Sequence, residues 1–368
     1  MLLRKRLGTR VFGFALLCAT TGLQTGFGQA KDTTAPPPPV VVGGFVDTYF
    51  SFNFGRPTSH VNTLRNFDVT ENQFTVAEAE VSITRAAAPI GFRVDLDFGP
   101  TNDIVQSGEI KPGALASVAN VGQAYVTWVA PLGGGLTIDA GKFVTHMGLE
   151  VIKAKDDYNY SRSFLFAFSI PYYHYGIRAS YPVSSTLNLC VHMYNSYNGP
   201  AVNSGKTFGF EAIYTPSPAL SIILNWIGGP ALPDPVSSKF RNVPNAIVTY
   251  QVSEKLLLAV DGVYGQENLP SGVNLWKGVA GYAKYTLCDP SSVTLRCEQY
   301  SDPEGYTTGI SQNLQEFTLT YEFKGLSNLI LRTEYRYDWS DQVAFDGAGG
   351  QLTRRNQSTL AVGAIVVF

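Results

Sequence analysis

One stretch of the sequence concentrates charged side chains of both signs. It runs from Glu150 to Arg162, and a run of apolar residues, "FLFAFSI" at Phe164–Ile170, follows it. The charged residues of this stretch are Glu150, Lys153, Lys155, Asp156, Asp157 and Arg162. Charged side chains that line a narrow passage select ions by their sign. Ion selection at a constriction is therefore the first chemistry that these residues suggest.

Catalysis is the second chemistry to consider, and the histidines are its natural candidates. A histidine base needs a nucleophile as partner and a third group that orients it. The sequence has no Gly-x-Ser-x-Gly motif and no phosphate-binding loop, and we find no close spacing of His, Cys and carboxylate residues of the kind that metal sites use. We interpret His146, His174 and His192 as polar residues at strand ends. The sequence thus predicts no catalytic residue, no metal site and no cofactor.

The composition is typical of an all-β protein with two unlike faces. Only 15% of the 368 residues are charged, against about 25% in ordinary soluble proteins, whereas 12% are aromatic and 36 residues are glycine. The formal net charge is −2, and no long basic block occurs after residue 10. Nucleic acid is therefore not an expected partner.

The first 40 residues indicate export. A basic start, the apolar run Val11–Ala19 and the small residues Gly28–Ala30 predict a cleaved signal peptide over residues 1–30. A helix of the mature protein and a lipid anchor on Cys18 are the alternatives. Residues 31–40 contain four consecutive prolines, which favour an extended periplasmic spacer. No later apolar stretch approaches the roughly 20 residues that a membrane helix needs.

From residue 41 onward, apolar and polar residues alternate with the period of two that β-strands show. In "GFRVDLDFG", Arg93 and Asp95 share one face, while Val94 and Leu96 share the other. Further arginines that we place on the polar face are Arg178, Arg296, Arg332 and Arg336. We interpret the polar face as the water-filled interior of a barrel, where arginines such as Arg93 should tolerate replacement by Gln. We expect Arg296 and Arg332 to tolerate the same replacement.

The alternating segments add up to about 16 predicted strands over residues 41–368. They lie near 41–54, 72–85, 91–98, 121–130, 136–144, 173–182, 186–195, 206–215, 220–227, 243–252, 256–264, 276–287, 293–301, 313–323, 329–338 and 357–368. Short and long connections alternate, with 265–275 among the long ones. A transmembrane antiparallel up-and-down β-barrel, with short periplasmic turns and long outer loops, has this layout. A soluble sandwich or propeller is the alternative, but no linker or repeat motif supports it.

The last predicted strand ends the chain on "LAVGAIVVF". Its apolar residues, from Leu360 to Phe368, alternate onto one face, which would contact lipid in a barrel. A terminal phenylalanine after such a strand resembles the signal that the outer-membrane barrel assembly machinery reads. We therefore predict that Phe368 acts as an assembly signal.

Residues 141–185 resemble a known family. The features are Gly141-Lys142-Phe143, Gly148 with Glu150, Asn159-Tyr160-Ser161-Arg162-Ser163 and Pro171-Tyr172-Tyr173-His174. The early strand Gly43–Phe54 and the last strand are similar as well, so that the likeness covers most of residues 41–368. The family is that of the OmpL-like β-barrel porins of Gram-negative outer membranes. The resemblance implies an outer-membrane channel and supplies no catalytic or substrate-binding residues.

These observations predict a multi-pass porin in the cell outer membrane of a Gram-negative bacterium. A barrel of 16 strands leaves an aqueous channel, which would allow passive diffusion of small hydrophilic solutes. The expected partners are outer-membrane lipid and lipopolysaccharide, the barrel assembly machinery and, in a homotrimer, further copies of the chain. A channel selective for a sugar or an organic acid and a non-conducting structural or adhesive barrel are the alternatives.

The connection over residues 145–172 is the longest predicted loop, and we expect it to fold inward and narrow the channel. The expected constriction residues are Glu150, Asp156, Asp157 and Arg162. In this interpretation Asp156 and Asp157 face Arg296 across the interior, with Arg332 and Arg336 near it, and the opposed charges set up a transverse field. The alternative is a loop that caps the outer mouth with solvated charges.

Overall fold

The computed structural model of the protein describes residues 36–109, 118–234 and 240–368. The predicted signal peptide, residues 1–30, lies outside these ranges, as does the first half of the predicted spacer. Residues 36–39 have no regular secondary structure and lead directly into the first strand. None of the helices in the described ranges combines the length and the apolar character that crossing a membrane requires.

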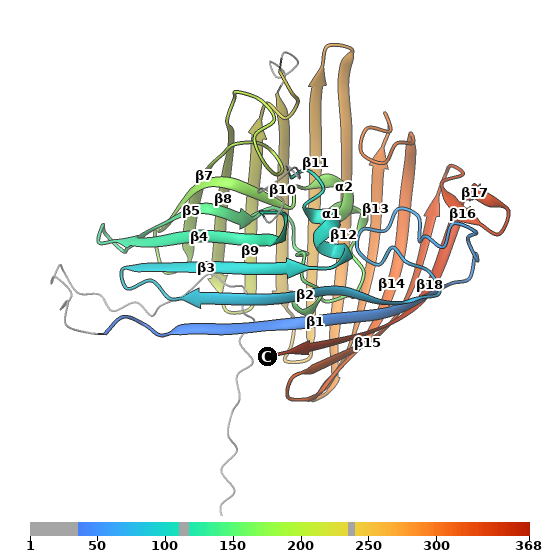
Figure 1. Cartoon of the computed structure of the whole chain (residues 1–368), viewed down its shortest axis with the longest axis horizontal. Coiled ribbons are helices and arrows are strands. Elements are labelled where there is room, and N and C mark those ends of the chain that lie inside the picture. The colour runs from blue at the N-terminus through green and yellow to red at the C-terminus, as the bar shows by residue number, and fades with distance from the viewer. Residues whose placement is uncertain (1–35, 110–117, 235–239) are drawn as a thin grey trace, which may run out of the picture. The chain divides into compact units, whose positions relative to one another are not determined.

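Within the described ranges, sixteen strands form one closed antiparallel barrel (Figure 1). They are β1 (Val40–Asn53), β2 (Phe74–Arg85), β3 (Ile90–Phe98), β4 (Val121–Ala130), β5 (Leu136–Val144), β6 (Tyr173–Pro182), β7 (Leu187–Tyr194), β8 (Thr207–Ser217), β9 (Leu220–Gly229), β10 (Arg241–Gln251), β11 (Leu256–Leu269), β12 (Gly272–Cys288), β13 (Ser291–Asp302), β14 (Gln312–Leu326), β15 (Leu329–Ser340) and β18 (Asn356–Val367). β18 pairs with β1 and closes the barrel. The predicted fold class is confirmed.

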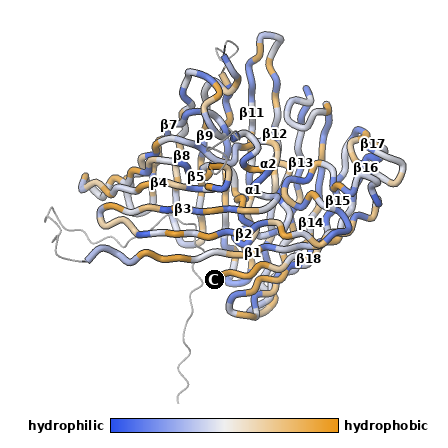
Figure 2. The backbone as a smooth tube through the Cα atoms, in the orientation of Figure 1, coloured by the Kyte–Doolittle hydropathy of each residue, from blue (hydrophilic) through white to orange (hydrophobic). Residues whose placement is uncertain are grey.

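The alternation of side chains explains why this sequence forms a barrel. On β15, Arg332, Glu334 and Arg336 are buried inside the barrel, whereas Leu331 and Tyr335 are exposed on its outside. β13 and β14 alternate in the same way. Figure 2 shows hydrophilic and hydrophobic positions succeeding one another along the strands. A barrel in lipid needs an apolar outer face, and these strands have the register that the sequence predicts.

The predicted loop at residues 265–275 is wrong. β11 and β12 continue through this stretch and pair with each other up to Leu269 and Gly272, so that only Pro270 and Ser271 lie between them. The stretch is polar and contains glycines, which is typical of a loop. Two antiparallel neighbours can nevertheless extend their backbone hydrogen bonds past the apolar part of the barrel. The tall hairpin formed by β11 and β12 is visible in Figure 1.

Further regular elements of the described ranges lie in long connections, besides a single 3₁₀ turn at residues 118–120. They are α1 (Pro100–Val105), the 3₁₀-helix η2 (Ala154–Asp156), α2 (Phe164–Ser169), and the hairpin of β16 (Phe345–Gly347) and β17 (Gly350–Arg354). Residues 145–172, which join β5 to β6 and contain η2 and α2, are called the inner segment below. Phe164, Leu165 and Phe166 of this segment belong to the same buried apolar cluster as Trp276 and Tyr300 of the barrel wall.

The two ends of the barrel sequence meet where the barrel closes. Phe368 exchanges two backbone hydrogen bonds with Gly44 on β1, each 3.0 Å long. The Phe368 side chain is exposed on the outside, as are Leu360, Val362 and Val366 on the same face of β18. The predicted outward face of the last strand is therefore observed.

Candidate pore constriction

The inner segment lies inside the barrel. α2 packs against β11, β12 and β13, and Ser163 caps its N-terminus by accepting a hydrogen bond from the Phe166 amide (3.1 Å). On the other side, Tyr160 donates its hydroxyl proton to Asp47 on β1 (3.0 Å). A Cβ atom at Gly363 of β18 would collide with the Tyr160 ring. The glycine in the terminal "LAVGAIVVF" thus leaves room for the segment.

Three wall arginines hold the backbone of the inner segment. Arg296 donates to the Ser161 carbonyl (2.7 Å), and Arg336 donates to the Arg162 carbonyl (2.5 Å). Arg332 reaches three carbonyls of the segment, those of Ala154 (2.5 Å), Asp157 (2.5 Å) and Asn159 (3.1 Å). Wall carboxylates pair with these arginines in turn: Glu316 with Arg296 (2.6 Å), Glu322 with Arg332 (2.6 Å) and Asp338 with Arg336 (2.7 Å). An irregular backbone inside a barrel needs such partners, and the polar wall supplies them.

Wall carboxylates bind the amide groups of the same segment. Glu334 accepts hydrogen bonds from the amides of Tyr160 (2.6 Å) and Ser161 (3.0 Å). Glu298 accepts from the first amides of α2, which are those of Phe164 (2.7 Å) and Leu165 (2.5 Å). A carboxylate is a favourable neighbour for amide groups that have no partner within their own helix. The wall therefore binds both the donors and the acceptors of the segment.

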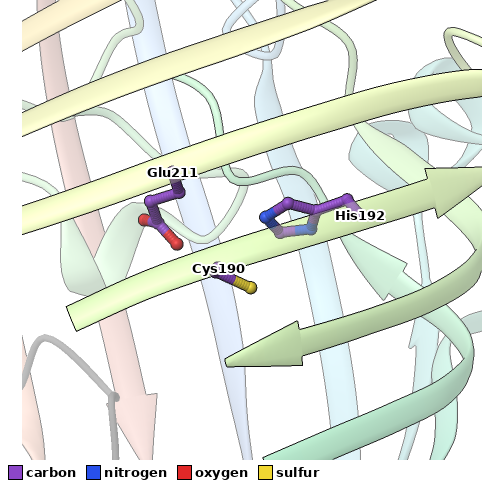
Figure 3. Close-up of side chains that lie close together, drawn as sticks. All are labelled: Cys190, His192 and Glu211. Atoms are coloured by element: carbon purple, nitrogen blue, oxygen red, sulfur yellow. The ribbon is translucent and has the colours of Figure 1, made fainter. Parts of the chain in front are cut away.

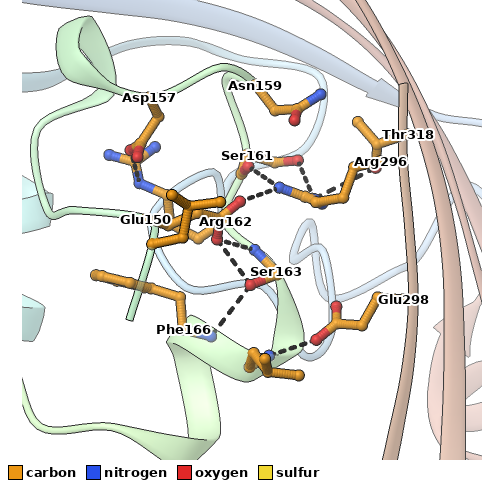
Figure 4. Close-up of polar contacts among 12 residues, drawn as sticks. Glu150, Asp157, Asn159, Ser161, Arg162, Ser163, Phe166, Arg296, Glu298 and Thr318 are labelled. Atoms are coloured by element: carbon orange, nitrogen blue, oxygen red, sulfur yellow. Dashed lines mark hydrogen bonds and ion pairs between the residues drawn. The ribbon is translucent and has the colours of Figure 1, made fainter. Parts of the chain in front are cut away.

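Charged side chains of the segment complete the network (Figure 4). Glu150 pairs with Arg296 (2.6 Å) and also accepts hydrogen bonds from the amide and the hydroxyl of Ser163 (2.7 Å each). Arg162 forms an ion pair with Asp157 (3.0 Å) and donates to the Val151 carbonyl (3.0 Å). Burial raises the pKa of the Asp157 carboxyl above its ordinary value, and the Arg162 guanidinium opposes this shift.

Lys153 ties the segment to the opposite part of the wall. Its ammonium group forms ion pairs with Asp95 on β3 (2.9 Å) and with Glu80 on β2. Of the predicted inner-wall charges, Asp95 is thus bound to the segment and also pairs with Arg93 (3.0 Å). The segment is consequently held from β1 to β3 on one side and from β13 to β15 on the other.

The arrangement of acids and arginines differs from the one the sequence suggested. Asp156 and Asp157 do not face Arg296 across an open gap: the acid of the inner segment that contacts Arg296 is Glu150. Asp157 is buried against Arg162, whereas the Asp156 side chain is 52% exposed and pairs with Lys155 (2.7 Å). The two neighbouring carboxylates differ because the backbone turns between them, so that one side chain points towards Arg162 and the other towards solvent.

The inner-wall arginines fall into two groups. Arg296, Arg332 and Arg336 are at most 1% exposed, so the expectation that Arg296 and Arg332 face water is wrong. Arg93 and Arg178 lie nearer the short turns, with side chains 24% and 26% exposed. Arg178 pairs with Asp139 on β5 (2.8 Å). These two remain in contact with the open part of the interior.

Two further segments from the long-loop rim reach the wall. Arg65, from the connection between β1 and β2, forms ion pairs with Asp338 (2.9 Å) and Asp68 (2.5 Å). Glu109, after α1, pairs with Lys142 on β5 (2.9 Å). A lone arginine or glutamate in a loop carries no signal in the sequence, so the roles of Arg65 and Glu109 could not be predicted.

A second cluster on the wall was missed altogether. Cys190 and His192 of β7 lie beside Glu211 of β8, and one ligand atom of each lies within 4.8 Å of the others (Figure 3). The expectation that no His, Cys and carboxylate side chains come together is wrong for these three. His146, His174 and His192, which lie at or near strand ends as expected, also pack together with Tyr194 in the interior. The Cys190-x-His192 spacing on one strand face was the available signal.

Comparisons with solved structures find porin barrels with low sequence identity. An anion-selective porin from Comamonas acidovorans has a TM-score of 0.63 and 12% identity, and the match covers 90% of this chain and 99% of that one. The outer membrane channel DcaP of Acinetobacter baumannii has a TM-score of 0.57 and 11% identity. OmpT of Vibrio cholerae has a TM-score of 0.56 and 12% identity. Each of these two matches covers 89% of this chain and 97% of the other. These likenesses show the fold alone.

A comparison with curated proteins finds no match. A family model does match, and it covers residues 39–368, which is the whole barrel. Its description is "Putative beta-barrel porin-2, OmpL-like". The resemblance noted in the sequence is therefore confirmed, and the chain belongs to this OmpL-like family of β-barrel porins.

Proposed function

We propose that the protein is an outer-membrane porin whose channel is narrowed by the inner segment. The observation that carries this proposal is the fixed position of the segment, which hydrogen bonds and ion pairs hold to opposite sides of a closed barrel. A polar wall suits water and small hydrophilic solutes, and the apolar outer face suits lipid. Membership of a porin family supports the same function. Solutes would cross by passive diffusion, without a catalytic step or a cofactor.

The proposal includes the outer membrane of a Gram-negative bacterium as the location. The outward apolar residues would contact lipid, and the long-loop rim would contact lipopolysaccharide. A signal peptide over residues 1–30 and recognition of Phe368 by the barrel assembly machinery are part of the proposal. A homotrimer is a further part: one of the similar structures is described as a trimer form of OmpT from Vibrio cholerae. Light scattering of the purified barrel in detergent tests the trimer.

Recording the purified protein in planar lipid bilayers tests the function. Discrete current steps that scale with salt concentration are expected of an open channel. Swelling of liposomes in sugars of increasing size then gives the size limit for solutes. A barrel that inserts but gives no current steps would contradict the porin function and favour the non-conducting structural barrel.

A preference for anions is a second candidate property. Four inward-facing cations near the short turns are partly exposed, namely Arg93, Arg178, Lys284 and Lys324, with exposed fractions of 24%, 26%, 18% and 44%. Their acidic partners Asp95, Asp139 and Glu322 are 0%, 12% and 5% exposed. Solutes that enter from this end therefore meet more positive than negative surface, which favours anions.

The reversal potential in a salt gradient tests this preference. We expect Arg93→Gln combined with Arg178→Gln to lower the anion-to-cation permeability ratio. Lys206→Gln, which removes an exposed cation between β7 and β8, is the matched control and should leave the ratio unchanged. A ratio that stays the same in the double variant would contradict a role for these arginines in anion preference.

A further inference from the structure

Three potential metal ligands lie together on the inner wall, apart from the inner segment. Cys190 and His192 are two positions apart on β7 and therefore share its inner face, and Glu211 is the direct partner of Cys190 on β8. Cys190 and His192 are 5% and 4% exposed. Figure 3 shows the three side chains side by side. A thiol, an imidazole and a carboxylate thus meet at one place on the wall.

Hydrogen bonds fix which nitrogen of His192 is available. The His146 Nε2–H donates to the Trp226 carbonyl (3.1 Å), which can only accept. In neutral His146, Nδ1 must then accept the proton of the Tyr194 hydroxyl (3.0 Å). The Tyr194 oxygen in turn accepts from the His192 Nδ1–H (2.6 Å). Neutral His192 is thereby left with a lone pair on Nε2.

The lone pair on His192 Nε2 accepts no hydrogen bond from the described residues. Nε2 of His192 is buried and finds no hydrogen-bond partner among the described residues. A buried nitrogen without a partner is costly, and in native proteins it calls for an explanation. A hydrogen bond that fixes Nδ1 and turns Nε2 towards a ligand is also how metal-binding histidines are oriented.

The surroundings hold this arrangement in place. The His146 ring stacks on His192 with a centroid distance of 4.2 Å. A Cβ atom at Gly209, the partner of His192 on β8, would lie 2.9 Å from the His146 ring, so glycine leaves room for the stack. Arg178, which faces His192 from β6, is bound to Asp139 (2.8 Å). The nearest guanidinium charge is therefore balanced by another carboxylate.

We propose that Cys190, His192 and Glu211 bind a divalent transition-metal ion of the Zn²⁺ type on the inner wall. Thiolate, imidazole and carboxylate are ligands of Zn²⁺, and three protein ligands leave a fourth position for water or a solute. Two anionic ligands balance the two charges of the ion. The three ligand atoms lie within 4.8 Å of one another, and metal–ligand bonds of roughly 2.0–2.3 Å require them to approach one another by about 1 Å.

Cobalt absorption tests the proposal directly. Co²⁺ is added to the full-length protein, folded in detergent with a reductant, in a background with Cys18→Ser, Cys288→Ser and Cys297→Ser, so that Cys190 is its single thiol. We expect one Co²⁺ per chain, with a thiolate-to-cobalt charge-transfer band that Zn²⁺ displaces. Cys190→Ser should abolish the band, and His192→Gln should weaken Co²⁺ binding at least tenfold. His60→Gln, at an exposed histidine, is the matched control and should bind like the background protein.

Three results would overturn the proposal: the absence of the band in the background protein, a band of full strength in the Cys190→Ser variant, or equal weakening by His60→Gln. Mobility before and after heating shows whether each variant is folded. Should Cys190→Ser not fold, Glu211→Gln decides, because Glu211 is the least buried of the three. An unchanged affinity for Co²⁺ in that variant would also refute the site.

Discussion

Arg332 illustrates how single residues organise the interior. Its guanidinium donates to three carbonyls of the inner segment and pairs with Glu322, yet the residue is 1% exposed. A buried guanidinium is stable only when its protons have acceptors. The segment therefore depends on Arg332, and Arg332 depends equally on the segment.

Replacing Arg332 by Ala should consequently be costly. The change leaves Glu322 short of its closest partner and frees three carbonyls, so the free energy of unfolding should fall by about 3–5 kcal/mol. Arg93→Ala breaks a partly exposed pair and should cost no more than about 1 kcal/mol. Equilibrium unfolding by urea in lipid vesicles measures both values. Equal losses would show that the contacts of Arg332 do not hold the segment.

Asp156 and Asp157 are neighbours with different surroundings, and their variants should differ accordingly. Asp156→Asn removes a half-exposed charge, so the reversal potential in a salt gradient should shift towards anion selectivity. Asp157→Asn removes a buried charge that Arg162 already neutralises, so it should shift the potential little and lower stability instead. Bilayer recordings and unfolding curves of the two variants separate these effects. A larger selectivity shift for Asp157→Asn would contradict the observed positions.

At the scale of elements, each strand separates a polar face from an apolar one. The strands bear few charges on the outer face of the barrel because a charge in the hydrocarbon region of the membrane has no partner. On β15 this rule places Leu331 outside and Arg332 inside. The alternation stops where both faces meet water, but the hydrogen-bonded strands can continue beyond that point, as β11 and β12 do.

A lysine on the outer face should therefore destabilise the barrel. Leu331→Lys should lower the free energy of unfolding by roughly 2–4 kcal/mol if the residue lies near the middle of the bilayer. Leu132→Lys makes the same change in the exposed turn after β4 and should cost little. Unfolding by urea in vesicles measures both, and similar losses at the two positions would reject the assignment of the outer face.

At the scale of the whole molecule, the sequence predicts the barrel far better than its interior. The alternation of apolar and polar residues that distinguishes the two faces lies within each single strand. The faces of β13 to β15 could therefore be assigned from the sequence. The contact of Glu150 with Arg296 joins residues 146 positions apart, and it depends on how the inner segment folds back. The cluster of Cys190, His192 and Glu211 likewise forms only when β7 and β8 pair in one register.

Closure of the barrel leads to a prediction about assembly. Phe368 lies at the seam between β18 and β1, where its backbone is hydrogen-bonded to Gly44. Deleting Phe368 should slow insertion and reduce the heat-modifiable form in cell envelopes, whereas Phe368→Tyr, which keeps the terminal aromatic ring, should assemble like the parent. Normal insertion of the truncated chain would exclude the terminal residue as an assembly signal.

The central claim is that the inner segment forms the constriction of a conducting channel. Single-channel conductance tests this claim most directly. Residues 153–163 are deleted in one variant, and residues 348–351, at the tip of the β16–β17 hairpin, in a control. We predict that the parent and the control conduct alike, and that the first deletion raises the conductance because it removes Lys153 and the carbonyls that bind the wall arginines. An unchanged conductance after deletion of 153–163, in a barrel that still inserts, would contradict the account.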